Sequence, residues 1–251
     1  MNLADLHLDH LSPSSINTYL DSPLRWYNHY VKGERGDYGD ALHRGIVAHD
    51  TLEQRFRAQI GEFDVDGWDW HAAVAVSDHV KSMERKPDGD LDTRELAMLL
   101  SEYWEKYGSK LTPTEIEMPF ALELPYARKL KKLIGRMDLV HTLNGKPAVI
   151  DFKTGRRKKS LHDVEFDIQA LVYGLALRDL MGVEGDIHFS YHQIVFTTIP
   201  QIVILDRPVT VAEMERFERE FLPGFVNTLE YQVETDNWFF NPNARFGTGL
   251  S

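Results

Sequence analysis

Two acidic residues face each other across a predicted β-hairpin. The dipeptide Asn144-Gly145 is typical of a two-residue hairpin loop, because both turn positions must accept positive φ. With that loop, Asp138 lies directly opposite Asp151. Opposed carboxylates repel each other unless one is protonated or a cation lies between them. The spacing therefore indicates a site for a divalent metal ion.

Basic side chains share this acidic face. Alternation along a strand places Lys153 beside Asp151, with Arg136 opposite Lys153. The charges could simply neutralise one another on a solvated face, but the segment AVIDFKTG is apolar up to Asp151, which favours a buried strand that presents a site. The same alternation directs four residues to the other face and into the core: Met137, Leu139, Ile150 and Phe152.

The hairpin belongs to a series of five motifs. In chain order these are LSPSSINTYLDSPLRWYNHYVKG, GIVAHDTLE, GRMDLV, VIDFKTG and DIQALVYGLAL. With these motifs the sequence resembles the PD-(D/E)XK nuclease superfamily, and within it the RecB-like exonuclease branch. That branch includes nuclease domains of recombination helicase–nucleases and CRISPR adaptation nucleases. Five motifs in the family's order are more specific than the D-x-K motif alone.

The resemblance implies a metal-dependent active site. His49, Asp138 and Asp151 would ligate the ion, with the Phe152 carbonyl as a further ligand. Carboxylate oxygens with one imidazole suit Mg²⁺ or Mn²⁺. Lys153 would be the catalytic lysine, which orients the attacking water or stabilises negative charge in the transition state of phosphodiester hydrolysis.

Other residues of these motifs carry alternative interpretations. Glu53 lies four residues after His49, so this pair is either a helix-surface contact or part of the metal site. Gln169 and Tyr173 share one helical face, where a tyrosine usually packs in the core. By resemblance, Gln169 orders the catalytic site, and Tyr173 contacts the substrate or supports the metal ligands. Glu117, on the preceding strand, resembles a family acid.

The chain has a formal net charge of −11, yet it contains two basic windows. Residues 128–136 and 153–159 each carry five basic side chains and no acid. Such runs are often solvated loops, but two of them beside an acidic site favour a groove that contacts phosphates. Trp26, Tyr27 and Tyr30 could stack on bases or pack in the core. The predicted substrate-binding residues are Arg136, Arg156, Arg157, Lys158 and Lys159.

The periodicity predicts helices before strands. Helical patterns cover 13–20, 40–60, 68–85, 93–107, 161–181 and 210–229, and strand patterns cover 116–124, 133–143, 146–153, 186–196 and 201–205. We expect an α/β fold, and the resemblance implies a restriction-endonuclease-like mixed sheet flanked by helices. Without a long linker, 1–251 is expected to be a single domain, mainly helical over 1–110, with the sheet core and C-terminal helix over 111–251.

The chain contains no cysteine. This excludes disulfides, thiolate zinc sites, a cysteine nucleophile and a thiolate-held iron–sulfur cluster. RecB-like relatives often build such a cluster from cysteines near both termini, and here Ser22-Pro23 stands where they have Cys-Pro. We expect aromatic packing to join the termini instead, through Trp26, Tyr27, Trp238, Phe239 and Phe240.

The expected function is a Mg²⁺- or Mn²⁺-dependent DNA exonuclease of recombination, repair or phage DNA metabolism, acting on single-stranded or end-containing DNA. Alternatives are a structure-selective endonuclease and a non-catalytic DNA-binding module. Loss of Asp151 or Lys153 would be typical of the module, and both are present. With no signal peptide pattern and no apolar run near the roughly 20 residues that span a bilayer, we expect a cytoplasmic location and no membrane partner.

Overall fold

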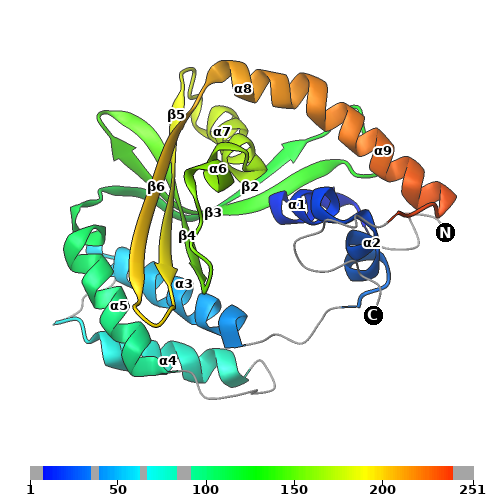
Figure 1. Ribbon diagram of the computed structural model, residues 1–251. Coiled ribbons are helices and arrows are strands. Elements are labelled where there is room, and N and C mark those ends of the chain that lie inside the picture. Colours follow the sequence, from blue (N-terminus) through cyan, green and yellow to red (C-terminus); the bar gives the residue numbers. More distant parts are fainter. Residues whose placement is uncertain (1–7, 35–39, 63–66, 84–91, 240–251) are drawn as a thin grey trace.

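A mixed β-sheet forms the centre of the molecule (Figure 1). The computed structural model describes residues 8–34, 40–62, 67–83 and 92–239. Strands β3 and β4 form the antiparallel hairpin, β2 pairs with β3, and β5 runs parallel to β4 and antiparallel to β6. The short β1 pairs in parallel with the start of β3. The strands are β1 His10–Leu11, β2 Pro113–Glu123, β3 Lys132–Leu143, β4 Lys146–Gly155, β5 Ile187–Val195 and β6 Gln201–Val209.

Helices cover both faces of the sheet, and a separate buried cluster fills each side. On one face lie α3 Asp40–Gln59, α4 Trp70–Met83 and α5 Thr93–Lys106 (Figure 1). The other cluster contains residues of α1 Pro13–Asp21, α2 Pro23–Trp26, α6 Leu161–Glu165, α7 Ile168–Met181, α8 Val211–Arg216 and α9 Leu222–Thr235. Short π-helical turns follow α2 (Tyr27–Val31) and α8 (Phe217–Phe221), and a 3₁₀ turn covers Gly108–Lys110. None of the described helices combines the length and hydrophobicity needed to cross a bilayer.

Local sequence signals account for most element boundaries. Ser12 caps α1 through its side chain, with Pro13 at the first helical position. Asn144 and Gly145 have φ values of 51° and 77°, which confirms the predicted turn. Thr210 and Glu213 form a capping box at the start of α8, where the predicted 210–229 helix begins. The predicted mixed α/β fold is confirmed.

Several boundaries differ from the prediction. The helix predicted over 161–181 is interrupted, because the side chain of Asp167 accepts from the Gln169 N–H and starts α7 as a new helix. The last strand continues from 205 to Val209. Pro23 follows the end of α1 but also begins α2, where its missing N–H costs no helical hydrogen bond.

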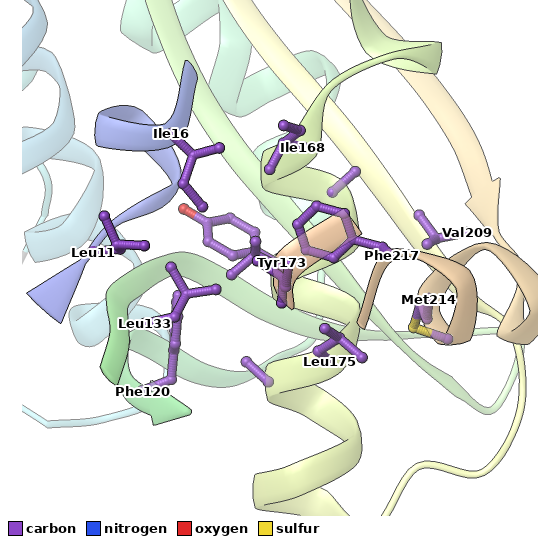
Figure 2. Close-up of a cluster of buried hydrophobic side chains, with 14 of the residues drawn as sticks. Leu11, Ile16, Phe120, Leu133, Ile168, Tyr173, Leu175, Val209, Met214 and Phe217 are labelled. Atoms are coloured by element: carbon purple, nitrogen blue, oxygen red, sulfur yellow. The ribbon is translucent and has the colours of Figure 1, made fainter. Parts of the chain in front are cut away.

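The larger cluster holds α7 against the sheet (Figure 2). Tyr173 lies in the centre of this cluster with Phe120 of β2, and their rings meet edge to face at 5.8 Å. Gly174 lets α8 approach α7 closely, since a Cβ there would lie 2.4 Å from the Met214 sulfur. This packing fixes the helix that carries Gln169 and Tyr173.

An aromatic stack joins α2 and the turn after it to the residues that follow α9. Trp238 stacks on Trp26 and Tyr27, at centroid distances of 5.7 and 4.8 Å. The Leu24 N–H donates to the Phe239 carbonyl at 3.2 Å. The predicted packing is therefore seen for Trp26, Tyr27 and Trp238, whereas the Phe239 side chain is largely exposed; Phe240 lies outside the described residues. Trp26 is 0% exposed, so the suggestion that it stacks on bases is wrong.

Replacing Trp238 by alanine is expected to destabilise the protein by about 2 kcal/mol, because two ring stacks and their buried area are lost. For a chain of this size that corresponds to a fall in melting temperature of about 4–8 °C. Phe239→Ala is the matched control, since it removes an exposed neighbouring ring and should cost less than about 0.5 kcal/mol. Equal melting temperatures for the two variants would show that the stack does not hold the tail.

Candidate active site

Strands β3 and β4 separate at Asp138. Their backbone pairing runs from Leu143↔Lys146 to Leu139↔Ile150. Beyond that point the Phe152 N–H donates to Asp138 Oδ2 at 2.7 Å, so a side chain takes the place of a ladder partner. The hairpin register is as predicted, but Asp138 and Asp151 are not a ladder pair, and neither are Arg136 and Lys153. The separation opens the sheet where the acidic residues lie.

A second distortion brings Glu117 of β2 to the same place. Its φ of 52° is unusual for a residue other than glycine. On either side of it, Ile116 pairs with Leu139, and Met118 pairs with Met137. The first pair packs in the cluster under α3, whereas the second pair packs in the opposite cluster. The expectation that Met137 shares a face with Leu139 is therefore wrong, because alternation is broken at Glu117 and Asp138.

His49, Glu117 and Asp138 form a candidate metal site. Each offers one ligand atom, and these atoms all lie within 4.8 Å of one another. His49 Nδ1 is 3.5 Å from Asp138 Oδ2. Helix α3 presents His49 here because its residues Leu52 and Phe56 pack with Phe152 of β4. One imidazole and two carboxylates fit Mg²⁺ or Mn²⁺.

Asp151 lies beside this group but is held by other partners. The residue is 1% exposed. Its Oδ2 forms an ion pair with Lys153 Nζ at 2.6 Å, and its Oδ1 accepts from Gln169 Nε2 at 2.7 Å. The Tyr173 hydroxyl is 3.3 Å from the same Oδ1. The predicted residues Asp151, Lys153, Gln169 and Tyr173 are thus brought together as one hydrogen-bonded unit.

The electrostatics of the site favour a bound cation. Burial and then the Asp151 charge raise the pKa of Asp138 well above its usual value. Burial and then Asp138 raise the pKa of Glu117 to about 7. Burial lowers the pKa of His49, which favours the neutral, metal-ligating imidazole. Negative charge is crowded around these ligand atoms, and a divalent ion would neutralise it.

Lys153 stays charged despite its surroundings. Burial acts against the ammonium group, but attraction to Asp151 raises the pKa of Lys153 overall. Its Nζ also donates to Gln169 Oε1 at 3.3 Å. Gln169 therefore bridges the lysine and the carboxylate, and Tyr173 donates to the Arg136 carbonyl at 2.8 Å, which ties α7 to β3.

Tyr191 is a site residue that the sequence reasoning missed. In the parallel register of β4 and β5 it is the partner of Asp151. Its hydroxyl contacts Gln169 Oε1 at 3.3 Å and also donates to Asp167 Oδ2. Lys153 Nζ lies 5.3 Å from the ring centroid. Only the pairing of β5 with β4, which a local pattern does not specify, could have pointed to it.

The Gln193 side chain forms two hydrogen bonds to the backbone of the loop after β4. Its side-chain oxygen accepts from the Lys159 N–H at 2.9 Å, and its amide donates to the Arg157 carbonyl at 2.8 Å. The Lys159 ammonium lies over the Tyr191 ring, 4.6 Å from its centroid. The loop therefore holds Lys159 close to Lys153.

The predicted substrate-binding residues differ in their contacts. Arg157 is exposed and pairs with Asp163 at 3.2 Å. Arg136 pairs with Glu117 at 3.5 Å, next to the candidate metal site. Arg156 and Lys158 are exposed, whereas Lys159 is half-buried.

Most of the 128–136 window does not face the site. Arg128 donates to the buried Glu230 of α9 and pairs with Glu234. Glu230 also accepts from the backbone N–H groups of 128, 129 and 130, so it organises this segment. The expectation that the whole window flanks the site is wrong, since the residue that contacts a site acid is Arg136.

Glu53 pairs with Arg57 at 2.9 Å and is not a member of the three-residue ligand group.

The similarity to known proteins extends over most of the chain. Residues 10–236 match the family model of the PD-(D/E)XK nuclease superfamily. One similar solved structure is that of a provisionally assigned exonuclease from Eubacterium rectale, with 16% identity, a TM-score of 0.49, and coverage of 92% of this chain and 81% of that chain. Another is SSO0001, with 15% identity, a TM-score of 0.31, and coverage of 82% and 81%. No curated protein matches the chain.

Proposed function

The chain belongs to the PD-(D/E)XK nuclease superfamily, and we propose that it is a divalent-metal-dependent exonuclease that hydrolyses DNA from an end. One observation carries the proposal of a working active site. The ligand group of His49, Glu117 and Asp138 lies directly beside the Asp151–Lys153 ion pair. This arrangement supports a site that offers ligands for an ion next to a positioned cation for the reacting phosphate.

We assign the ligand role to His49, Asp138 and Asp151, with the Phe152 carbonyl, and add Glu117 to this set. A bound Mg²⁺ or Mn²⁺ supplies positive charge that polarises the scissile phosphate and acidifies the attacking water. Asp151 pairs with Lys153 at 2.6 Å. Asp151 would thus serve as a ligand and also hold the Lys153 ammonium in position, where it would stabilise the charge that develops on the phosphate.

Gln169 and Tyr173 act as positioning residues. Gln169 contacts both Asp151 and Lys153, so it sets the direction of the two groups. Tyr173 lies against the same carboxylate and anchors to the Arg136 carbonyl. Arg136, Arg156, Arg157, Lys158 and Lys159 would contact phosphates of the bound strand.

Two other functions predict different products. A structure-selective endonuclease would cut closed circles that contain a junction or flap, and a DNA-binding module would cut nothing. The presence of Asp151 and Lys153 in one ion pair favours an enzyme over the module. The setting that we propose, in recombination, repair or phage DNA metabolism, rests on membership of this nuclease superfamily.

The test uses end-labelled linear DNA and closed circular DNA, each single- and double-stranded, and closed circles that contain a junction or flap, with Mg²⁺, Mn²⁺ or EDTA. We expect the linear molecules to be shortened from their ends when an ion is present, and the circles to remain intact. Cutting of circles would support the endonuclease instead. Intact DNA of every form, with either ion, would contradict the proposal of a nuclease active on DNA.

A further inference from the structure

A polar hollow of about 430 Å³ lies beside the candidate active site. It is formed by the start of α3, the start of α5, the end of β4 and the turn between β5 and β6. Among the described residues that line it, two positive side chains and two hydroxyls face one carboxylate and one ring. The lining residues are Arg44, Glu95, Arg156, Phe196, Thr197 and Thr198.

Arg44 is held in position yet has unused donors. Its guanidinium lies over the Phe196 ring, 5.0 Å from the centroid. Its Nη1 is 3.8 Å from Glu95 Oε2, which is longer than a hydrogen bond. Its Nε is buried and has no hydrogen-bond partner among the described residues. A buried donor without an acceptor is unfavourable, and an anionic oxygen in the hollow would satisfy it.

The hollow lies at the end of β4, the strand that carries Asp151 and Lys153. A Cβ on Gly45 would lie 2.9 Å from Thr154 Oγ1, so α3 contacts β4 one residue beyond Lys153. The Phe196 N–H donates to the Gly155 carbonyl at 2.8 Å, which places the β5–β6 turn next to Arg156. Arg44 and His49 lie five residues apart on the same helix, α3.

We propose that this hollow binds a phosphate group of the nucleic-acid substrate. The inference rests on the proposed nuclease function and deepens it by naming a substrate subsite. Two guanidinium groups against one carboxylate give the hollow a net positive charge, and guanidinium donors match phosphate oxygens in pairs. The hydroxyls of Thr197 and Thr198 add further donors.

Glu95 is expected to affect nucleic-acid binding in the opposite direction to Arg44. Its carboxylate balances Arg44 in the free protein and repels a phosphate in the hollow. Glu95→Gln should therefore strengthen nucleic-acid binding, whereas Arg44→Gln should weaken it. A general loss of folding could produce the second effect but not the first.

The experiment measures binding of labelled DNA by fluorescence anisotropy at several salt concentrations. The full chain is assayed in EDTA so that the DNA is not consumed. We expect Arg44→Gln and Arg156→Gln each to weaken binding about tenfold and to reduce the log–log salt slope by about 0.7 for single strands or 0.9 for duplexes. Arg216→Gln, which removes an exposed arginine of α8, is the matched control and should change neither quantity.

The same measurement on DNA with 5′-phosphate, 3′-phosphate or hydroxyl ends shows whether the bound phosphate is terminal or internal. A loss by Arg44→Gln that is confined to one phosphorylated end identifies a terminal phosphate, and an equal loss on all ends identifies an internal one. An Arg44→Gln variant with unchanged affinity and slope would overturn the subsite while leaving a DNA-cleaving wild type intact. A wild type that neither binds nor cleaves DNA would overturn the proposed function and the subsite together.

Discussion

A Lys153→Met variant is expected to lose DNA hydrolysis by about 10³-fold or more at saturating DNA and metal ion. The substitution keeps an unbranched side chain but removes the ammonium proposed to stabilise charge on the reacting phosphate. It also leaves the buried Asp151 carboxylate without its ion-pair partner at 2.6 Å. The metal-free variant should therefore be less stable by up to about 3–5 kcal/mol, and added Mn²⁺ should recover part of this loss. Single-turnover rates and thermal melts measure the two effects.

Lys146→Met is the matched control for this variant. Lys146 lies at the exposed start of the same strand, and its loss should leave rate and stability close to wild type. Hydrolysis by Lys153→Met at the wild-type rate would exclude Lys153 from the chemistry. Equal slowing in both variants would indicate a general effect of lost positive charge.

An Asp138→Asn variant is expected to lose both hydrolysis and stabilisation by metal. The amide oxygen of asparagine can still accept the Phe152 N–H, now at 2.7 Å from Asp138 Oδ2, so the local fold should persist. Removal of one charge also relieves repulsion with Asp151, and the metal-free melting temperature should not fall. In wild type, Mn²⁺ at about 100 times its Kd should stabilise by about 2.7 kcal/mol, or about 5–10 °C, and this gain should be absent from the variant.

Asp50→Asn tests whether the effect is specific to the ligand group. Asp50 follows His49 on α3 and accepts from Gln54, so it changes charge nearby without removing a proposed ligand. Its Mn²⁺-dependent gain should equal that of wild type. The same gain in Asp138→Asn would show that Asp138 does not ligate the ion.

Local signals in the sequence predicted most of the elements and the hairpin register. The turn at Asn144-Gly145, the cap at Ser12 and the capping box at Thr210 each depend on a few adjacent residues, so they can be recognised without tertiary context. The break at Asp167 was missed, because hydrophobic spacing on both sides of it is helical. The hydrogen bond from the Gln169 N–H to the Asp167 side chain, which starts α7, does not appear in that spacing.

The distorted part of the site could not be predicted from alternation. Period-two reasoning assumes that both strands remain regular, but the positive φ of Glu117 and the strand separation at Asp138 break the alternation at the candidate ligands. Glu117 consequently joins His49 and Asp138 as the third candidate ligand, although Asp151 appeared to be the partner of Asp138 from the register. The motifs predicted that these residues lie near one another. Which of their atoms are in contact depends on the distortion at Glu117 and Asp138.

Charge runs gave the least structural information. The two basic windows have the same composition, yet one is largely bound to α9 through Glu230 and the other forms a loop beside Lys153. Arg44 has no basic neighbour that would draw attention to it. Its position in the polar hollow depends on the packing of α3 against β4, which brings together residues more than a hundred positions apart.

The most direct test of the central claim is the rate of phosphodiester hydrolysis by wild type, Lys153→Met and Asp138→Asn, purified in parallel and assayed on linear DNA with Mn²⁺ or with EDTA. We predict rapid cleavage by wild type with Mn²⁺, no cleavage with EDTA, and losses of about 10³-fold or more in both variants. Cleavage that persists in EDTA, or that survives in either variant at the wild-type rate, would contradict a metal-dependent active site at these residues.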